Sequence, residues 1–175
     1  MNQSPPACWP EMDIPNDDVA ETADQFRVAA NLLFDKVVTQ HVVCPVLVVA
    51  AFAVELYLKA LNARNVYTNL SEECGVDSWQ VTAQAQKSGH NLTELYNALL
   101  PDVKQGLDEA YSQHRLKRRF SSLQAALNDY SRVFIDWRYP FEDPDKGKCD
   151  SINGLVSLAN FFGEYVSGLQ KQKSR

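Results

Sequence analysis

The sequence predicts an all-α protein, folded as an antiparallel bundle of five or six helices. Apolar residues recur at intervals of three and four almost throughout, which is the period of an amphipathic helix. No alternating strand pattern of useful length and no repeat of solenoid period is visible, and 175 residues suit one domain with a sizeable core. We therefore expect an irregular N-terminal arm over 1–15, a single helical-bundle domain over 16–170 and a solvated tail over 171–175.

The first half of the bundle is predicted to contain two long helices. Helical spacing of apolar residues, with acidic residues at the start, predicts a helix from Asn16 to about Gln40. A second helix is expected from about Pro45 to about Arg64, because proline suits a first helical turn. This second helix is apolar on every side over most of its length, which is typical of a helix in the middle of a bundle.

The second half is predicted to contain shorter helices. Residues 65–88 are polar, and because a structureless loop of this length is uncommon, they have room for a short extra helix near 78–86. Capping residues or a suitably placed proline introduce four further helices, expected over about 91–99, 101–114, 121–138 and 150–169. The segment 142–148 is expected to be a loop.

Composition excludes several classes of protein. A net charge of -5 argues against a globally basic nucleic-acid-binding protein, although it permits a local basic patch. The four cysteines are far apart and form no C-x-x-C pair, so neither a metal nor another cofactor is expected. The chain begins without a secretion-signal pattern, and its most apolar stretch, 42–54, is shorter than the roughly 20 residues that span a bilayer. We expect a cytoplasmic protein without membrane contact.

Three segments suggest a family. They are AVELYLKAL over 53–61, GHNLTEL over 89–95 and FIDWRYPFE over 134–142. In this order and spacing within a helical chain they resemble the HEPN domains of bacteria, over roughly residues 16–170. The resemblance implies a bundle that often forms homodimers and occurs in toxin–antitoxin pairs, phage defence and RNA processing, in some cases beside a nucleotidyltransferase-type partner protein. Because a fold does not fix a function, these are associations only.

The catalytic motif of that family is missing. The resemblance implies that catalytic members would carry an R-x4-6-H motif. Its arginine and histidine converge across a dimer interface to cut RNA. None of the eight arginines precedes His41, His90 or His114 by the required distance. We therefore assign no catalytic residue, and a metal-independent ribonuclease with a divergent site is only an alternative.

One polar cluster is expected, formed by Glu55, Lys59, His90, Arg138 and Glu142. Glu55 lies in an apolar helix, where a carboxylate needs partners to offset its desolvation, and Lys59 follows it by four residues. The planar guanidinium of Arg138 suits a carboxylate, and Glu142 could join the same group. We interpret the cluster first as a structural ion-pair network. If it is a ligand site, its cations and His90 offer donors suited to phosphate.

The second candidate site is a basic run. Arg115, Lys117, Arg118 and Arg119 could contact a phosphate backbone, and Phe120 could stack on a base. The alternative interpretation is a solvated helix end, where cations complement the helix dipole.

These observations favour a non-catalytic, HEPN-like binding or accessory protein, expected to be a homodimer. It would act with RNA, a nucleotide or a protein partner in a bacterial defence, toxin–antitoxin or stress system. The first alternative is the divergent ribonuclease. The second is a helical protein-interaction module without any link to nucleic acid.

Overall fold

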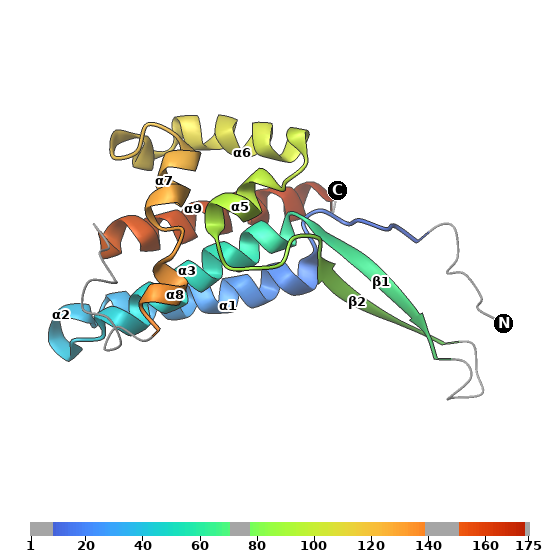
Figure 1. Cartoon of the computed structure of the whole chain (residues 1–175), viewed down its shortest axis with the longest axis horizontal. Helices are drawn as coiled ribbons and strands as arrows, with labels where there is room; N and C mark the ends of the chain where they lie inside the picture. Colours follow the sequence, from blue (N-terminus) through green and yellow to red (C-terminus); the bar gives the residue numbers. More distant parts are fainter. Residues whose placement is uncertain (1–8, 71–77, 139–150, 174–175) are drawn as a thin grey trace.

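The structure, a computed structural model, describes residues 9–70, 78–138 and 151–173. Within these ranges it is mostly helical, as predicted, but it also contains a small antiparallel sheet (Figure 1). Three long helices lie side by side at its centre, namely α1 (Asp17–Phe34), α3 (Val43–Ala60) and α9 (Ile152–Lys173). The expectation of a purely all-α protein is therefore wrong in one element, the sheet.

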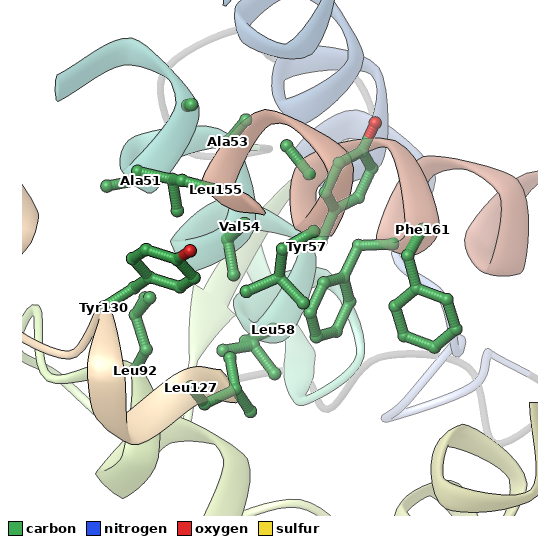
Figure 2. Packing of buried hydrophobic residues seen from close by; sticks show 14 of the residues in the cluster. Ala51, Ala53, Val54, Tyr57, Leu58, Leu92, Leu127, Tyr130, Leu155 and Phe161 are labelled. Carbon is green, nitrogen blue, oxygen red and sulfur yellow. The ribbon is translucent and has the colours of Figure 1, made fainter. Parts of the chain in front are cut away.

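Helix α3 forms the centre of the core. It packs against α1 and α9 and also against two shorter helices, so it is buried on nearly all sides. Figure 2 shows its side chains meeting those of α7 and α9 in one apolar cluster. By length and composition α3 could cross a membrane, but 56% of it is buried inside the protein. The prediction of a helix in the middle of the bundle is confirmed.

The predicted first helix is shorter than expected. The Asn16 side chain caps α1 by accepting a hydrogen bond from the Val19 amide at 3.2 Å. The helix ends at Phe34, and after the single turn of α2 (Val37–Gln40) His41 adopts a left-handed conformation with φ 54°. The continuous helix to residue 40 is wrong, because the chain must reverse direction here to pack α3 against α1.

A β-hairpin replaces the predicted loop and extra helix. Strand β1 (Ala63–Asn69) pairs with β2 (Trp79–Ala85) so that Val66 lies opposite Thr82. β-branched and aromatic residues in both strands favour this conformation. The expectations of no strand and of a short helix near 78–86 are wrong. Both faces of the hairpin are partly exposed, so its sequence lacks the alternation of a half-buried strand.

The described part of the N-terminal arm is irregular, as predicted, and lies along the hairpin. The Asn65 amide donates to the Glu11 carbonyl at 2.7 Å, and the Tyr67 hydroxyl donates to the Pro10 carbonyl at 2.6 Å. The Trp9 ring contacts Tyr67, with ring centroids 5.1 Å apart. The arm therefore extends the edge of β1.

The C-terminal helix is longer than expected. Helix α9 continues to Lys173, whose ammonium group contacts Asp13 Oδ1 and the Pro15 carbonyl oxygen, both at 2.6 Å. Residues 171–173 are exposed, as the predicted solvated tail requires, but they belong to the helix. The two contacts hold the end of α9 beside the N-terminal arm.

The shorter elements cover one side of the three long helices (Figure 1). In chain order they are α5 (Leu92–Asn97), α6 (Pro101–Gln113), the 3-10 helix η1 (Arg115–Arg118), α7 (Leu123–Asp129) and α8 (Val133–Asp136). The predicted cap is confirmed at Asn91, which accepts from the Glu94 amide at 3.1 Å. The predicted helix over 121–138 is broken into α7 and α8, and Ser122 caps α7 in place of Ser121.

A polar network joins the three long helices. The Tyr57 hydroxyl donates to Asp24 Oδ1 at 2.6 Å, and Arg27 Nε donates to both Asp24 and Tyr57 at 3.0 Å. Burial and the hydrogen bond to Asp24 raise the pKa of Tyr57, so the hydroxyl keeps its proton. Gly163 of α9 faces this network directly: a Cβ at residue 163 would lie 2.5 Å from Arg27 Nε.

Gly163→Ala is expected to destabilise the protein by about 1–3 kcal/mol, because the added methyl group displaces Arg27 from its partners. Equilibrium unfolding in urea measures the change in the free energy of unfolding. Gly168→Ala in the same helix is the matched control, since a Cβ there meets nothing within 4 Å. The control is expected to stabilise the protein by up to about 1 kcal/mol, because alanine favours a helix over glycine. Equal effects of the two variants would contradict the close contact at Gly163.

Candidate functional site

The structure brings Glu55, Lys59 and His90 together. The Glu55 side chain is fully buried, and its carboxylate accepts from Lys59 Nζ at 2.6 Å. Its two oxygens also lie 3.0 and 2.9 Å from His90 Nδ1. Lys59 is 19% exposed and His90 is 43% exposed, so both link the buried carboxylate to the surface. The cluster therefore supplies the partners that a carboxylate in an apolar helix requires.

Local backbone geometry places His90 over α3. Gly89 has φ 104°, a left-handed conformation that glycine adopts without steric cost, and the chain turns there. Asn91 then caps α5, so His90 is held between a turn and a helix start. The sequence predicted His90 beside this cap and in one cluster with Glu55, and the structure brings the two side chains into direct contact.

Arg138 lies near the cluster but does not bind its carboxylate. In the described structure Glu55 contacts Lys59 and His90, and the Arg138 guanidinium lies over the Phe134 ring, 5.1 Å from its centroid. The same ring contacts His90, with centroids 4.9 Å apart. A direct Glu55–Arg138 pair is not among the described contacts, and the Phe134 ring of α8 contacts both His90 and the Arg138 guanidinium. Residue 142, the remaining expected member, lies outside the described residues.

The geometry of the cluster permits two roles. Nδ1 of His90 is directed at the Glu55 carboxylate, and among the described residues no hydrogen-bond partner faces Nε2, so that nitrogen could accept or donate a proton. The same contacts also fix the turn before α5 on α3, which is a structural role. A fully buried carboxylate and a lysine four residues away are sufficient for the structural role alone.

The basic run forms a second site, at η1. Arg115, Arg118 and Arg119 are exposed, and no carboxylate pairs with them in the part of the chain that the structure describes. They line an open depression of about 500 Å³. Its other wall is the beginning of α9, where Ser151, Asn153, Gly154 and Ser157 lie. We call this depression the arginine groove.

The two walls of the arginine groove have the same electrostatic sign. Three guanidinium groups carry full positive charges, and the first turn of a 22-residue helix carries the positive end of its dipole. Ser151 Oγ accepts from the Gly154 amide at 3.0 Å and so caps this helix. The groove is therefore suited to an anion with several oxygens. The sequence showed the arginines, but no local pattern placed residues 151–157 opposite them.

The other residues of the basic run are used differently. Lys117 lines a separate, smaller depression beside α7. Phe120, predicted to stack on a base, is half-buried and packs edge-on against Tyr130, with centroids 5.7 Å apart. The Arg119 guanidinium lies 5.3 Å from the Phe120 ring centroid. Phe120 thus supports one arginine of the groove from within the fold.

His114 anchors the turn that carries these arginines. Its Nδ1 accepts from the Leu116 amide at 3.3 Å, and its ring contacts Phe161 of α9. Burial lowers the pKa of His114, the Arg115 guanidinium adds to this effect, and the Glu164 carboxylate opposes it. The neutral imidazole is the form that can accept the capping hydrogen bond.

Other features carry less chemistry. Another depression, about 720 Å³ beside α6, is open and is lined by side chains of both charges, including Lys104 and Glu109. Among the described residues, no group of three histidine, cysteine, aspartate or glutamate side chains could hold a metal ion.

Comparison with protein-family models, with curated proteins and with solved structures found no match. The HEPN resemblance inferred from the three sequence segments therefore stays a prediction.

Lys59→Met is expected to destabilise the protein by about 3–5 kcal/mol, because it leaves the buried Glu55 carboxylate without its closest cation. Lys87→Met is the matched control, since Lys87 pairs with Glu94 at 3.1 Å on the surface, with side chains 43% and 60% exposed. The control is expected to cost about 0–1 kcal/mol. Urea unfolding of both variants at pH 7 measures the difference. A Lys59→Met variant as stable as the control would show that Glu55 does not depend on this ion pair.

Proposed function

We propose that this protein is a non-catalytic, HEPN-like RNA-binding accessory protein that holds the RNA phosphate backbone in the arginine groove. The proposal rests on one observation: three arginines without a carboxylate partner in the described ranges surround a depression at the start of α9. The HEPN resemblance of the sequence supports a role in a bacterial defence, toxin–antitoxin or stress system, in the cytoplasm.

Electrostatics favours RNA over a free nucleotide as the ligand. The arginines lie along an open depression, which suits successive phosphates of a chain better than one enclosed nucleotide. The nearest candidate for base stacking, Phe120, already packs in the fold. Contacts to phosphate alone carry no sequence information. With a net charge of -5 on the whole chain, binding should be local, weak and sensitive to salt.

The triple variant Arg115→Gln, Arg118→Gln, Arg119→Gln is expected to weaken binding of single-stranded RNA. It should also reduce the slope of log Kd against log salt by about 2, because each lost phosphate contact removes about 0.7 from that slope. Fluorescence anisotropy with a labelled RNA, measured between 50 and 200 mM salt, follows both quantities; three contacts correspond to about 20-fold tighter binding at the lower salt. The variants' circular dichroism spectra check that the fold is retained.

A matched control separates the groove from net charge. Lys36→Gln, Arg64→Gln, Lys171→Gln removes the same number of charges from exposed positions that do not line the groove. The control should keep the wild-type salt slope. If both triple variants lose the slope equally, the arginine groove is ordinary surface. If the wild type shows no salt-dependent binding at all, the helical interaction module without a nucleic-acid link becomes the better proposal.

A second candidate function, RNA cleavage, is favoured by the Glu55–His90 contact. A carboxylate on Nδ1 orients an imidazole so that Nε2 can transfer a proton, as a general acid or base requires. The resemblance argues against it, because the R-x4-6-H motif is missing. We expect RNA incubated with the pure protein and EDTA to stay intact. Cleavage by the wild type that His90→Gln abolishes, with folding retained, would reverse the order of the two candidates.

A further inference from the structure

The outer edge of β2 is an unprotected pairing edge. The Leu70 amide donates to the Ser78 carbonyl and the Gln86 amide to the Asn62 carbonyl, so even-numbered residues of the hairpin direct their backbone groups at each other. The backbone groups of the odd-numbered residues then face outward, as the bond from the Asn65 amide to Glu11 shows for β1. On β2 these outward residues are Trp79, Val81, Ala83 and Ala85.

The N-terminal arm covers only one of the two edges of the hairpin. The N-terminal arm covers part of the β1 edge, through the Asn65–Glu11 bond and the Asn65 and Tyr67 side chains, which both donate to the Pro10 carbonyl. Within the described residues, no segment makes the equivalent bonds to Val81 or Ala83 of β2. A two-stranded hairpin is only marginally stable in water, so a further strand on this edge would stabilise it.

The sequence of β2 lacks the usual protection of an edge strand. Natural edges carry lysine, proline or a bulge, which prevent pairing with another chain. The seven residues WQVTAQA contain no charge, no proline and no glycine, and their pairing with β1 runs without a bulge. The hairpin also projects from the helices, so its edge is accessible to another molecule (Figure 1).

We propose that β2 pairs with β2 of a second copy of this chain, in an antiparallel arrangement around a two-fold axis at Thr82. Full-length pairing of residues 79–85 with themselves places Thr82 opposite Thr82, and Val81 opposite Ala83. Both copies then present outward backbone groups at the same positions, which is the self-complementarity that a two-fold interface requires. The result is a four-stranded sheet shared by the dimer.

A second copy fits this edge better than a charged partner strand. The edge is neutral, so pairing it with itself places no like charges opposite each other, although each chain carries a net charge of -5. The hairpin emerges near the C-terminal end of α9, and the first turn of that helix is about 30 Å away along its 22 residues. The dimer therefore leaves both arginine grooves open, and the proposal is independent of RNA binding.

A cysteine at the two-fold axis tests the register. Thr82 would form a non-hydrogen-bonded pair with its symmetry mate, with Cα atoms about 4.5 Å apart, within the range of a disulfide. Thr82→Cys, in a chain whose four native cysteines are replaced by serine, is expected to form a disulfide-linked dimer on mild oxidation. Gln84→Cys is the matched control, because Gln84 lies opposite Gln80 of the partner and not opposite itself. Equal cross-linking of the two variants overturns the register.

A proline at an outward position tests the edge itself. Ala83→Pro removes an amide that points away from β1, so the internal ladder keeps its bonds while the outer edge loses a donor. Light scattering is expected to show a dimer for the wild type and for Ala83→Val, and a monomer for Ala83→Pro at the same concentration. Melting temperatures of diluted, monomeric samples check that the fold is retained. A monomeric wild type at all accessible concentrations, or a dimer unchanged by Ala83→Pro, overturns the proposal.

Discussion

The burial of α3 on nearly all sides is the constraint on which the other features depend. A helix packed on nearly all sides gives its one acidic residue, Glu55, no access to water, so the carboxylate needs partners from neighbouring side chains. Lys59 reaches it along the helix, and His90 reaches it from the turn before α5. The polar cluster thus fixes the start of the second layer on the core. Small side chains on α1 and α9 permit the close packing that buries α3, as at Gly163.

The elements that could be predicted from the sequence are those whose apolar period directly reflects burial. The apolar pattern predicted α3 in the middle of the bundle, and the spacing of Glu55 and Lys59 predicted their ion pair, because both depend on neighbours within one helix. It failed at the hairpin, because strands exposed on both faces need no apolar alternation. The place of Arg138 was also not predictable, since nothing in its own segment indicates that its guanidinium lies over the Phe134 ring, which in turn contacts His90.

The arginine groove illustrates a different limit. A basic run at the end of a helix has two ordinary interpretations, and the residues of the run do not decide between them. What favours the anion site is helix α9, which begins more than thirty residues later in the chain. Its first turn lies opposite the guanidinium groups and carries the positive end of the helix dipole. Cations at an ordinary solvated helix end would be stabilised by a nearby carboxylate. The described surroundings of these arginines instead add the positive end of the α9 dipole. An anion bound there would meet positive potential from both walls.

The two proposed surfaces would reinforce each other through geometry. Three arginine contacts give weak binding on their own, because each acts in water and is screened by salt. A dimer joined through the hairpins would present two arginine grooves at its far ends, each about 30 Å from the hairpin along α9. An RNA long enough to span both would bind its second groove as an intramolecular event, with an affinity raised by the effective concentration. A short RNA would gain nothing from the dimer, so the length of RNA that first benefits measures the separation of the two grooves.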